Sequence, residues 1–401
     1  MQIENTPFQL TYCTNIHPGE DWEDTFTQLK KHLPIVKQQF SPNSPLGVGL
    51  RLSDKASKKI LIGNNFEEFK NWLSQNNLYV FTMNGFPFGS FHRTVVKDDV
   101  HTPDWTTQYR LDYTIRLFNI LINLLPEDLN EGGISTSPLS YKYWHNSLNN
   151  VYEQATINYT KIALHLHNIK KQTGKSLHLD LEPEPDGVLE NTPEVIDYFN
   201  KWLVPKGSEF LSKELSLPKE ECEEIIREHI QLCYDVCHYA IAFEEPAEVF
   251  EAMKNAKIKI GKIQISAALK ANFTESASAN NKILTVLKKF EESTYLHQVI
   301  EKNNSNELIQ FRDLNNALDN YKSDENKEWR IHFHVPLFSD DYDLLKSTRS
   351  EIEKTIQYIK NHSEVKHLEI ETYTWEVLPE SFQKDIDESI VRELEWVKSK
   401  F

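Results

Sequence analysis

Apolar and polar positions alternate along several short stretches of the chain, and longer amphipathic stretches separate them. Successive side chains of a β-strand point to opposite faces, so strict alternation is typical of a strand. In Leu177–Glu184 the leucines share one face, whereas His178 and Asp180 share the other. The stretches Lys262–Ser266 and His367–Trp375 alternate in the same way. Because each polar face is followed by a helical pattern, we expect these faces to converge on one axis.

Eight strand patterns alternate with helical patterns, and no low-complexity linker interrupts them. The predicted strands are Phe8–Ile16, Leu46–Ser53, Leu78–Met83, Gly133–Pro138, Ser176–Glu182, Leu232–Val236, Ile258–Ser266 and His367–Thr374. The predicted helices include Glu20–Gln39, Asn65–Gln75, Thr106–Leu125, Tyr141–Thr173 as one long helix or a broken one, Thr192–Leu203, Lys219–Gln231, Pro246–Lys254, a helical stretch ending at Phe290, Tyr342–Asn361 and Glu380–Lys398. Such alternation is typical of parallel strands with helical crossovers. Eight units favour a closed (β/α)8 TIM barrel over an open doubly wound sheet, and we expect residues 1–401 to form this single domain.

One extended run exceeds the eight that a barrel needs. Trp329–Val335 has the character of a strand, and Tyr295–Ile300 with Glu307–Arg312 has the pattern of a hairpin. We therefore expect an insertion after the seventh strand, at about residues 291–336.

Composition narrows the class of protein. The 401 residues are 39% apolar, which is enough for a substantial core. The net charge of −16 argues against a nucleic-acid or anionic-membrane surface. The longest apolar stretches, such as Leu117–Leu125, are shorter than a membrane span, and no basic-then-apolar leader opens the chain. We therefore expect a cytoplasmic protein. The usual glycine-rich nucleotide signatures do not occur.

The four cysteines form neither a recognisable zinc site nor a redox motif. Cys13, Cys222, Cys233 and Cys237 contain no C-x-x-C pair. Small buried thiols are the expected role.

The polar side chains at the ends of the predicted strands are the first candidates for chemistry, because TIM-barrel enzymes place their sites there. They are Asn15, His17, Arg51, Asn84, Ser135, Glu182, Asp235 with His238, Gln264 and Glu371. Three carboxylates among imidazole and amide groups suit Mn²⁺, Mg²⁺, Co²⁺ or Zn²⁺. A carboxylate at a barrel mouth must be solvated, paired or bound to a metal, because burying it alone is unfavourable by several kcal/mol.

Each of these candidate side chains could also have a purely structural role. Asp235 and His238 are spaced to share a cavity, but they could equally be a structural pair. His332 and His334 lie on one face of a strand, as in many metal sites, and two core or rim histidines would show the same spacing. Arg51 could clamp an anion or serve as a counter-ion for the carboxylates.

The aromatic turn Phe86–Phe88 and Trp105 are expected to roof the mouth of the barrel and line an apolar part of a pocket. Packing of a loop against the rim is the alternative.

The order of these groups resembles a known series. Glu182, Asp235 with His238, Gln264 and Glu371 are similar to the metal ligands of the xylose isomerase-like barrels, the sugar phosphate isomerases and epimerases. Five segments over nearly the whole chain more specifically resemble the family of the metabolite traffic protein EboE. They are YCTNIHPGEDW (Tyr12–Trp22), NGFPFGSFH (Asn84–His92), LDLEPEPDG (Leu179–Gly187), DVCHYA (Asp235–Ala240) and HFHVPLF (His332–Phe338).

The resemblance implies a single divalent metal held by Glu182, Asp235, the seventh-strand residue and Glu371. It also implies that the two glutamates act as acid and base on opposite faces of a carbon next to a carbonyl. The superfamily commonly has histidine on the seventh strand, where this chain has Gln264. Either the metal is held less tightly, or His334 supplies the missing ligand from the insertion, or no metal binds. The expected substrate-binding residues are His17, Arg51, Asn84, His238 and His332.

Two functions follow from this set. The first is a metal-dependent isomerase or epimerase-like enzyme for a small polar metabolite, sugar-like or prenylated, in a metabolite traffic or precursor maturation pathway whose other proteins are expected partners. The second is a non-catalytic barrel that binds a metabolite and hands it on, with a degenerate metal site. A DNA endonuclease of the same superfamily would need a basic face, which the acidic charge disfavours. An amidohydrolase would carry its H-x-H on the first strand, whereas His332 and His334 lie far along the chain.

Overall fold

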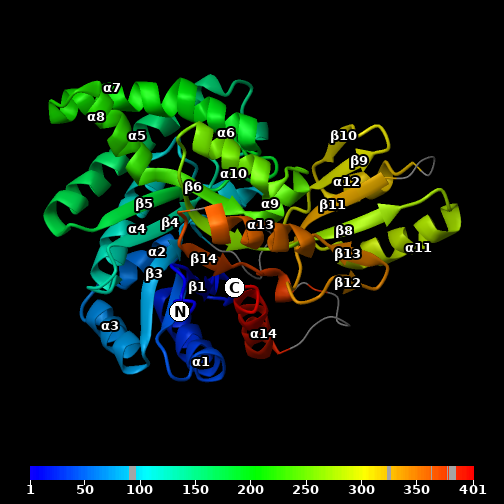
Figure 1. The fold of residues 1–401 in the computed structure, drawn as a ribbon, viewed down its shortest axis with the longest axis horizontal. Coiled ribbons are helices and arrows are strands. Elements are labelled where there is room, and N and C mark those ends of the chain that lie inside the picture. Colours follow the sequence, from blue (N-terminus) through cyan, green and yellow to red (C-terminus); the bar gives the residue numbers. More distant parts are fainter. Residues whose placement is uncertain (90–95, 323–326, 363, 377, 379–384) are drawn as a thin grey trace.

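The computed structural model describes residues 1–89, 96–322, 327–362, 364–376, 378 and 385–401. Eight parallel strands form one ring, in the order β1-β14-β7-β6-β5-β4-β3-β2 (Figure 1). They are β1 (Gln9–Tyr12), β2 (Leu46–Arg51), β3 (Leu78–Asn84), β4 (Glu131–Thr136), β5 (Ser176–Leu181), β6 (Ile230–Asp235), β7 (Ile260–Ile265) and β14 (His367–Ile370). The predicted (β/α)8 barrel is therefore confirmed.

The ring closes between β1 and β2 mainly through threonine side chains. The hydroxyl of Thr11 donates to the carbonyl of Gly47 at 2.8 Å and accepts from the amide of Gly49 at 2.9 Å. The amide of Arg51 donates to the hydroxyl of Thr14 at 2.9 Å, and one parallel bridge joins Cys13 to Gly49. These contacts satisfy backbone groups that an open edge would leave unpaired.

Helices cover the outside of the ring. Those that follow the barrel strands are α1 (Trp22–Phe40), α2 (Asp54–Lys59), α3 (Asn65–Gln75), α4 (Gln108–Leu124), α5 (Asn149–Thr173), α6 (Thr192–Tyr198), α7 (Val204–Leu215), α8 (Lys219–His229), α9 (Val236–Ile241), α10 (Pro246–Asn255), α13 (Arg349–His362) and α14 (Ile386–Lys398). Their apolar faces form one hydrophobic cluster with the strands. The first residues of the predicted helix Glu380–Lys398 lie outside the described residues.

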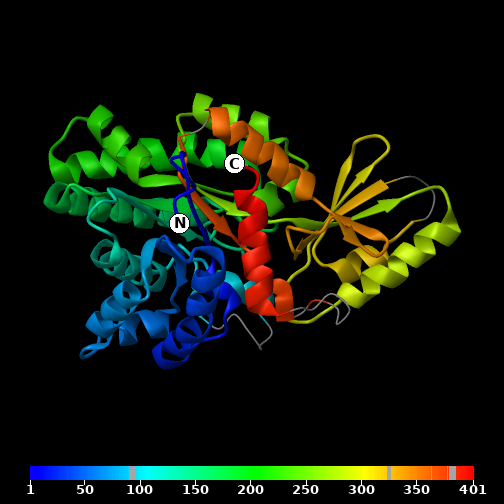
Figure 2. The same cartoon turned by 60° about the horizontal axis from the view of Figure 1, so that its bottom comes forward.

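The chain between β7 and α13 forms a second, antiparallel sheet beside the barrel (Figures 1 and 2). Its order is β10-β9-β11-β8-β13-β12, and it packs against α11 (Ala277–Leu287) and α12 (Leu314–Asp319). The strands are β8 (Ala268–Phe273), β9 (Val299–Asn303), β10 (Leu308–Phe311), β11 (Lys327–His334), β12 (Asp341–Tyr342) and β13 (Leu345–Ser347). The segment expected as an insertion, about residues 291–336, lies within this region. The expected hairpin is present as β9 and β10.

One predicted element is wrong in this region, and one strand was not predicted. Tyr342–Asn361 is not one helix, because β12 and β13 form a tight hairpin and α13 begins only at Arg349. The hairpin turns at Asp343, whose φ of 61° lies in the left-handed region. β8 was not predicted as a strand, because its sequence ALKANF suits a helix. Pairing with β11 and β13 overrides that local preference.

A buried carboxyl group joins α14 to the mouth of the barrel. Glu393 Oε1 accepts hydrogen bonds from the amide of Leu337 at 3.0 Å and from the hydroxyl of Thr372 at 2.9 Å. Thr372 directly follows Glu371, so this contact helps to fix the end of β14. Burial raises the pKa of Glu393 to about 8.

We predict that the stability of the protein falls as the pH rises toward 8, and that Glu393→Gln removes this component. The unfolded glutamate loses its proton near pH 4.5, whereas the folded one keeps it to about 8. Between these values unfolding releases a proton, so higher pH favours the unfolded chain. The stability of the variant relative to wild type should rise by up to about 1.4 kcal/mol per pH unit. Urea unfolding of both proteins at pH 6, 7 and 8 measures this difference in the free energy of unfolding. A difference that does not change with pH would contradict the raised pKa of Glu393.

Candidate metal centre at the carboxyl ends of the strands

A cavity of about 50 Å³ lies at the carboxyl ends of the barrel strands. Barrel residues and residues of the segment before β9 line it together. The lining residues are Asn15, Asn84, Phe86, Pro87, Val96, Lys97, Val100, Glu182, Glu184, His238, Tyr295, Leu296, Gln298, His332, Glu371 and Tyr373. The second sheet is therefore part of the site.

Three carboxylates from three strands converge here. Glu182 directly follows β5, Asp235 ends β6, and Glu371 directly follows β14. One oxygen of each lies within 4.8 Å of the others, and the three residues are at most 5% exposed. Burial, reinforced by the neighbouring carboxylates, raises the pKa of Glu182 and of Glu371 well above the ordinary value. Three buried carboxylates in one volume need protons or a cation to balance their charge.

Hydrogen bonds from the protein fix part of two of these carboxylates, Glu371 and Asp235. Glu371 Oε1 accepts from the side-chain amides of Asn15 at 2.7 Å and Asn84 at 2.9 Å. Asp235 Oδ1 accepts from the hydroxyl of Ser266 at 2.6 Å and from the amide of His238 at 3.1 Å, which caps α9. Asp235 Oδ2 and Glu182 Oε2 are buried without a hydrogen-bond partner among the described residues. These two oxygens are free to bind an ion.

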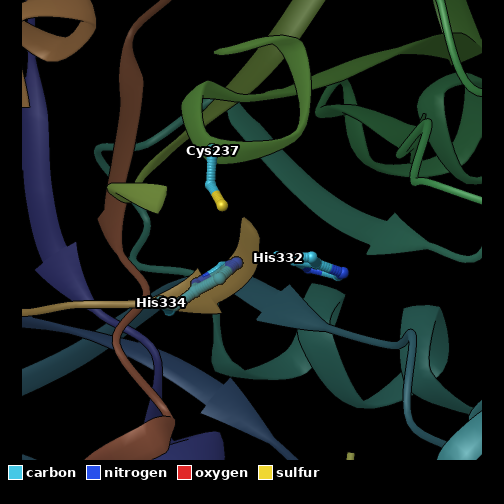
Figure 3. Close-up of side chains that lie close together, drawn as sticks. All are labelled: Cys237, His332 and His334. Carbon is cyan, nitrogen blue, oxygen red and sulfur yellow. The ribbon is translucent and has the colours of Figure 1, made fainter. Parts of the chain in front are cut away.

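Histidines of β11 approach the same volume. In Figure 3, the sulfur of Cys237 points toward the imidazoles of His332 and His334, and the three ligand atoms lie within 4.8 Å of one another. His334 also groups with Asp235 and His238. The Nδ1 of His334 lies 2.7 Å from the carbonyl oxygen of Glu371, so it carries the hydrogen and donates it.

That hydrogen bond leaves Nε2 of His334 unprotonated in the neutral ring, and burial lowers the pKa of this ring. Nε2 has no partner within the described chain. A ring nitrogen held by a carbonyl, with the other nitrogen open, is the usual state of a metal-binding histidine.

His238 and His332 face each other through their Nε2 atoms, 3.1 Å apart. The Nδ1 of His238 donates to the carbonyl of Pro183 at 2.7 Å, and the Nδ1 of His332 donates to Oε1 of Gln298 at 2.8 Å. Two neutral rings would therefore direct lone pairs at each other. Burial, reinforced by His238, lowers the pKa of His332 well below its ordinary value.

Gln264 lies between two acidic strands. Its register partners are Asp235 on β6 and Glu369 on β14. Its side chain is fully buried, and neither the amide oxygen nor the amide nitrogen has a hydrogen-bond partner in the part of the chain that the structure describes. An amide oxygen left open in this way fits a weak ligand.

Two predicted substrate-binding residues lie away from the cavity lining. His17 Nε2 lies 3.0 Å from the hydroxyl of Tyr12, and the ring stacks on His32 at 4.3 Å. Arg51 donates to the carbonyls of Gly19, at 2.9 Å, and Gly89, which ties two loops together. The predicted residues Asn84, His238 and His332 line the cavity itself.

The aromatic residues near the mouth divide between cavity and packing. Phe86 and Pro87 line the cavity. Trp105 is fully buried, packs on Tyr159 at 4.4 Å and donates to the hydroxyl of Thr136. It belongs to the core. Ser90–His92, at the end of the segment Asn84–His92, lie outside the described residues.

Several cavity residues were not predicted. The segment directly before β9 contributes Tyr295, Leu296 and Gln298. No local sequence pattern predicts that this segment approaches the barrel. Glu184 could have been recognised, since it continues the acidic run after β5. Its Oε1 lies 3.3 Å from Nε2 of His101.

A buried ion pair lies below this site. Lys262 of β7 and Glu369 of β14 are both fully buried and paired, and Lys262 also donates to the hydroxyl of Ser135 at 3.2 Å. Burial opposes the charge on Lys262, but Glu369 outweighs it and raises the pKa of the amine. A Cβ on Gly49 would lie 1.8 Å from Glu369 Oε1, so only glycine leaves room for this carboxylate. Because Lys262 already pairs with Glu369, the three upper carboxylates need protons or another cation.

The strands and helices define a (β/α)8 TIM barrel, with a candidate metal centre at the carboxyl ends of its strands. The chain is similar in structure to a xylose isomerase-like TIM barrel protein from Mycobacterium smegmatis in complex with magnesium, with a TM-score of 0.51, 9% identity, and coverage of 100% of this chain and 98% of that one. It is also similar to the IolI protein with a bound zinc atom, with a TM-score of 0.48, 10% identity, and coverage of 97% and 96%. No family model and no curated protein sequence matches the chain.

We predict that Lys262→Met destabilises the protein by about 3–5 kcal/mol, because it leaves Glu369 buried and unpaired. Lys262→Met/Glu369→Gln should recover most of this loss, as measured by urea unfolding. The matched control is Lys213→Met, which removes one member of the exposed pair with Glu209 and should change stability by less than about 1 kcal/mol. A double variant as unstable as Lys262→Met alone would contradict the pairing.

Proposed function

We propose that this protein is a divalent-metal-dependent isomerase or epimerase-like enzyme for a small polar metabolite. One observation carries the proposal. Glu182, Asp235 and Glu371 bring three buried carboxylates to within 4.8 Å, while Lys262, buried below them, is committed to Glu369. A divalent cation would balance this charge and occupy the open oxygens of Glu182 and Asp235.

The proposed ligands are Glu182, Asp235 and Glu371, with His334 in place of a seventh-strand histidine and Gln264 as a weak amide ligand. The open Nε2 of His334 and the open amide of Gln264 support this set. An oxygen-rich site with one imidazole suits Mn²⁺ or Mg²⁺ and also admits Co²⁺ or Zn²⁺. When bound, the metal would polarise a substrate oxygen next to the reacting carbon.

Proton transfer is assigned to Glu182 and Glu371. β6 and β7 separate their strands in the ring, so the two carboxylates approach the cavity from different sides. Burial, reinforced by the neighbouring carboxylates, raises the pKa of both glutamates well above the ordinary value, which favours the protonated form that a general acid needs. Asn15 and Asn84 hold Glu371 in place through Oε1.

The cavity wall suggests the kind of substrate. Asn84, His238 and His332 would hold a polar, sugar-like part, whereas Phe86 and Tyr295 would contact an apolar part such as a prenyl group. Arg51 and His17 would act indirectly, through the loops that they anchor.

The resemblance to EboE supports a role in metabolite traffic or precursor maturation, with other proteins of the same pathway as partners. A cytoplasmic location is part of this proposal. None of the helices that the structure describes combines the length and apolar character that a membrane span requires.

A non-catalytic barrel that binds a metabolite and hands it on is the second candidate. Gln264 favours it, because a neutral amide at the seventh strand binds transition metals more weakly than an imidazole does.

The first test measures metal content. We predict that Glu182→Gln and Asp235→Asn lose the metal bound by natively purified protein, because each removes a charged ligand. Glu184→Gln is the matched control: this residue also lines the cavity and is 8% exposed, but it lies outside the carboxylate group. Elemental analysis by mass spectrometry measures the metal, and circular dichroism checks the fold. Equal metal content in all variants would refute the assignment.

The second test separates the enzyme from the binding protein. Wild-type protein loaded with Mn²⁺ should catalyse deuterium exchange from D2O into a ketose or aldose at the carbon next to the carbonyl. Glu371→Gln should slow this exchange by about 100-fold or more, and Glu184→Gln should not. Nuclear magnetic resonance follows the exchange. Metabolite binding without any exchange in wild type would favour the non-catalytic barrel.

A further inference from the structure

A second group of metal-ligating side chains lies at the opposite, amino-terminal end of the barrel lumen. Glu131 opens β4, His367 opens β14, and His178 is the third residue of β5. Each offers a ligand atom within 4.8 Å of the other two. Nε2 of His178 lies 3.6 Å from Oε1 of Glu131, and the rings of His178 and His367 stack at 5.4 Å. β14 is not a neighbour of β4 or β5, so these side chains meet across the lumen.

A buried carboxylate orients His178. The Nδ1 of His178 donates to Oδ1 of Asp180 at 2.7 Å, and Asp180 is fully buried. In the neutral ring this leaves the lone pair of Nε2 directed toward the side where Glu131 lies. A carboxylate that holds one nitrogen of a histidine while the other binds an ion is the usual outer shell of a zinc site.

The barrel makes room for this pair through two glycines. A Cβ on Gly133 of β4 would lie 2.3 Å from Cε1 of His178. A Cβ on Gly261 of β7 would lie 2.1 Å from Oδ1 of Asp180. A side chain at Gly133 would displace His178, and one at Gly261 would displace Asp180. Glycine at these two positions therefore allows the His178–Asp180 pair to form.

Two ring nitrogens remain open. Nε2 of His178 and Nδ1 of His367 have no hydrogen-bond partner among the residues described, and the two residues are only 1% and 3% exposed. With the carboxylate of Glu131 beside them, these open nitrogens give the cluster three ligand groups for one metal ion.

We propose that Glu131, His178 and His367 bind a second divalent transition-metal ion, with Zn²⁺ as the best fit. Two imidazoles and one carboxylate are common zinc ligands, and the fourth position would hold water. The side chain of Glu131 is 32% exposed, which gives the ion access from solvent. The amino-terminal end of a TIM barrel contributes to stability rather than catalysis, so this ion would fasten β4, β5 and β14 together.

The test uses the full chain in a Glu182→Gln background, which removes the upper site. After chelator treatment, calorimetric titration with Zn²⁺ should show one equivalent bound in Glu182→Gln. In Glu182→Gln/His367→Gln the affinity should fall by about 100-fold. Glu182→Gln/His362→Gln is the matched control, because His362 is an exposed histidine outside the cluster. It should bind zinc as the parent does.

Glu131→Gln provides a variant at the rim of the barrel, where the side chain is 32% exposed, and leaves the core unchanged. In the same background, Co²⁺ should give visible d–d absorption that Glu131→Gln abolishes, and Zn²⁺ should raise the melting temperature of the parent but not of this variant. The proposal would be overturned if the Glu182→Gln parent bound no zinc, or if the His367→Gln and Glu131→Gln variants bound zinc as tightly as this parent does. His178 would then be a protonated ring between Asp180 and Glu131. Metal loss at the upper site is measured separately, by comparing wild type with Glu182→Gln.

Discussion

The charge balance inside the barrel constrains the rest of the structure. Five buried carboxylates project from the strands or directly follow them, namely Asp180, Glu182, Asp235, Glu369 and Glu371. Lys262 neutralises Glu369, and the Nδ1 of His178 donates a hydrogen bond to Asp180. Because an unpaired buried charge is strongly unfavourable, the three carboxylates at the mouth must gain protons or a cation. The raised pKa values of Glu182 and Glu371 express the same constraint.

The need to accommodate buried charged groups also explains why the strands have glycine at three positions. Gly49 leaves room for Glu369, and Gly133 with Gly261 leaves room for the His178–Asp180 pair. The lumen is thus arranged in layers, with a histidine-containing layer at the amino-terminal end, an ion pair in the middle and the carboxylates at the mouth. The second sheet adds His332 and His334 to the upper layer, where the seventh barrel strand supplies only an amide.

The sequence was sufficient for the barrel and for the upper carboxylates. Period-two alternation in Leu177–Leu181 and His367–Ile370 determines which side chains point inward, and the end of each strand then fixes the position of Glu182 and Glu371. The second sheet was harder to predict, since β8 has a sequence that suits a helix and forms a strand only because β11 and β13 pair with it. Likewise, nothing local distinguishes Arg51, which anchors two loops, from Asn84, which reaches the cavity.

Anomalous diffraction from crystals soaked in Mn²⁺ tests the central claim most directly, because it locates the cation without reference to activity. The account predicts the strongest anomalous peak in the volume bounded by Glu182, Asp235 and Glu371. Peaks confined to exposed surface carboxylates, with none in this volume, would contradict it and would show that protons alone balance the charge of the mouth.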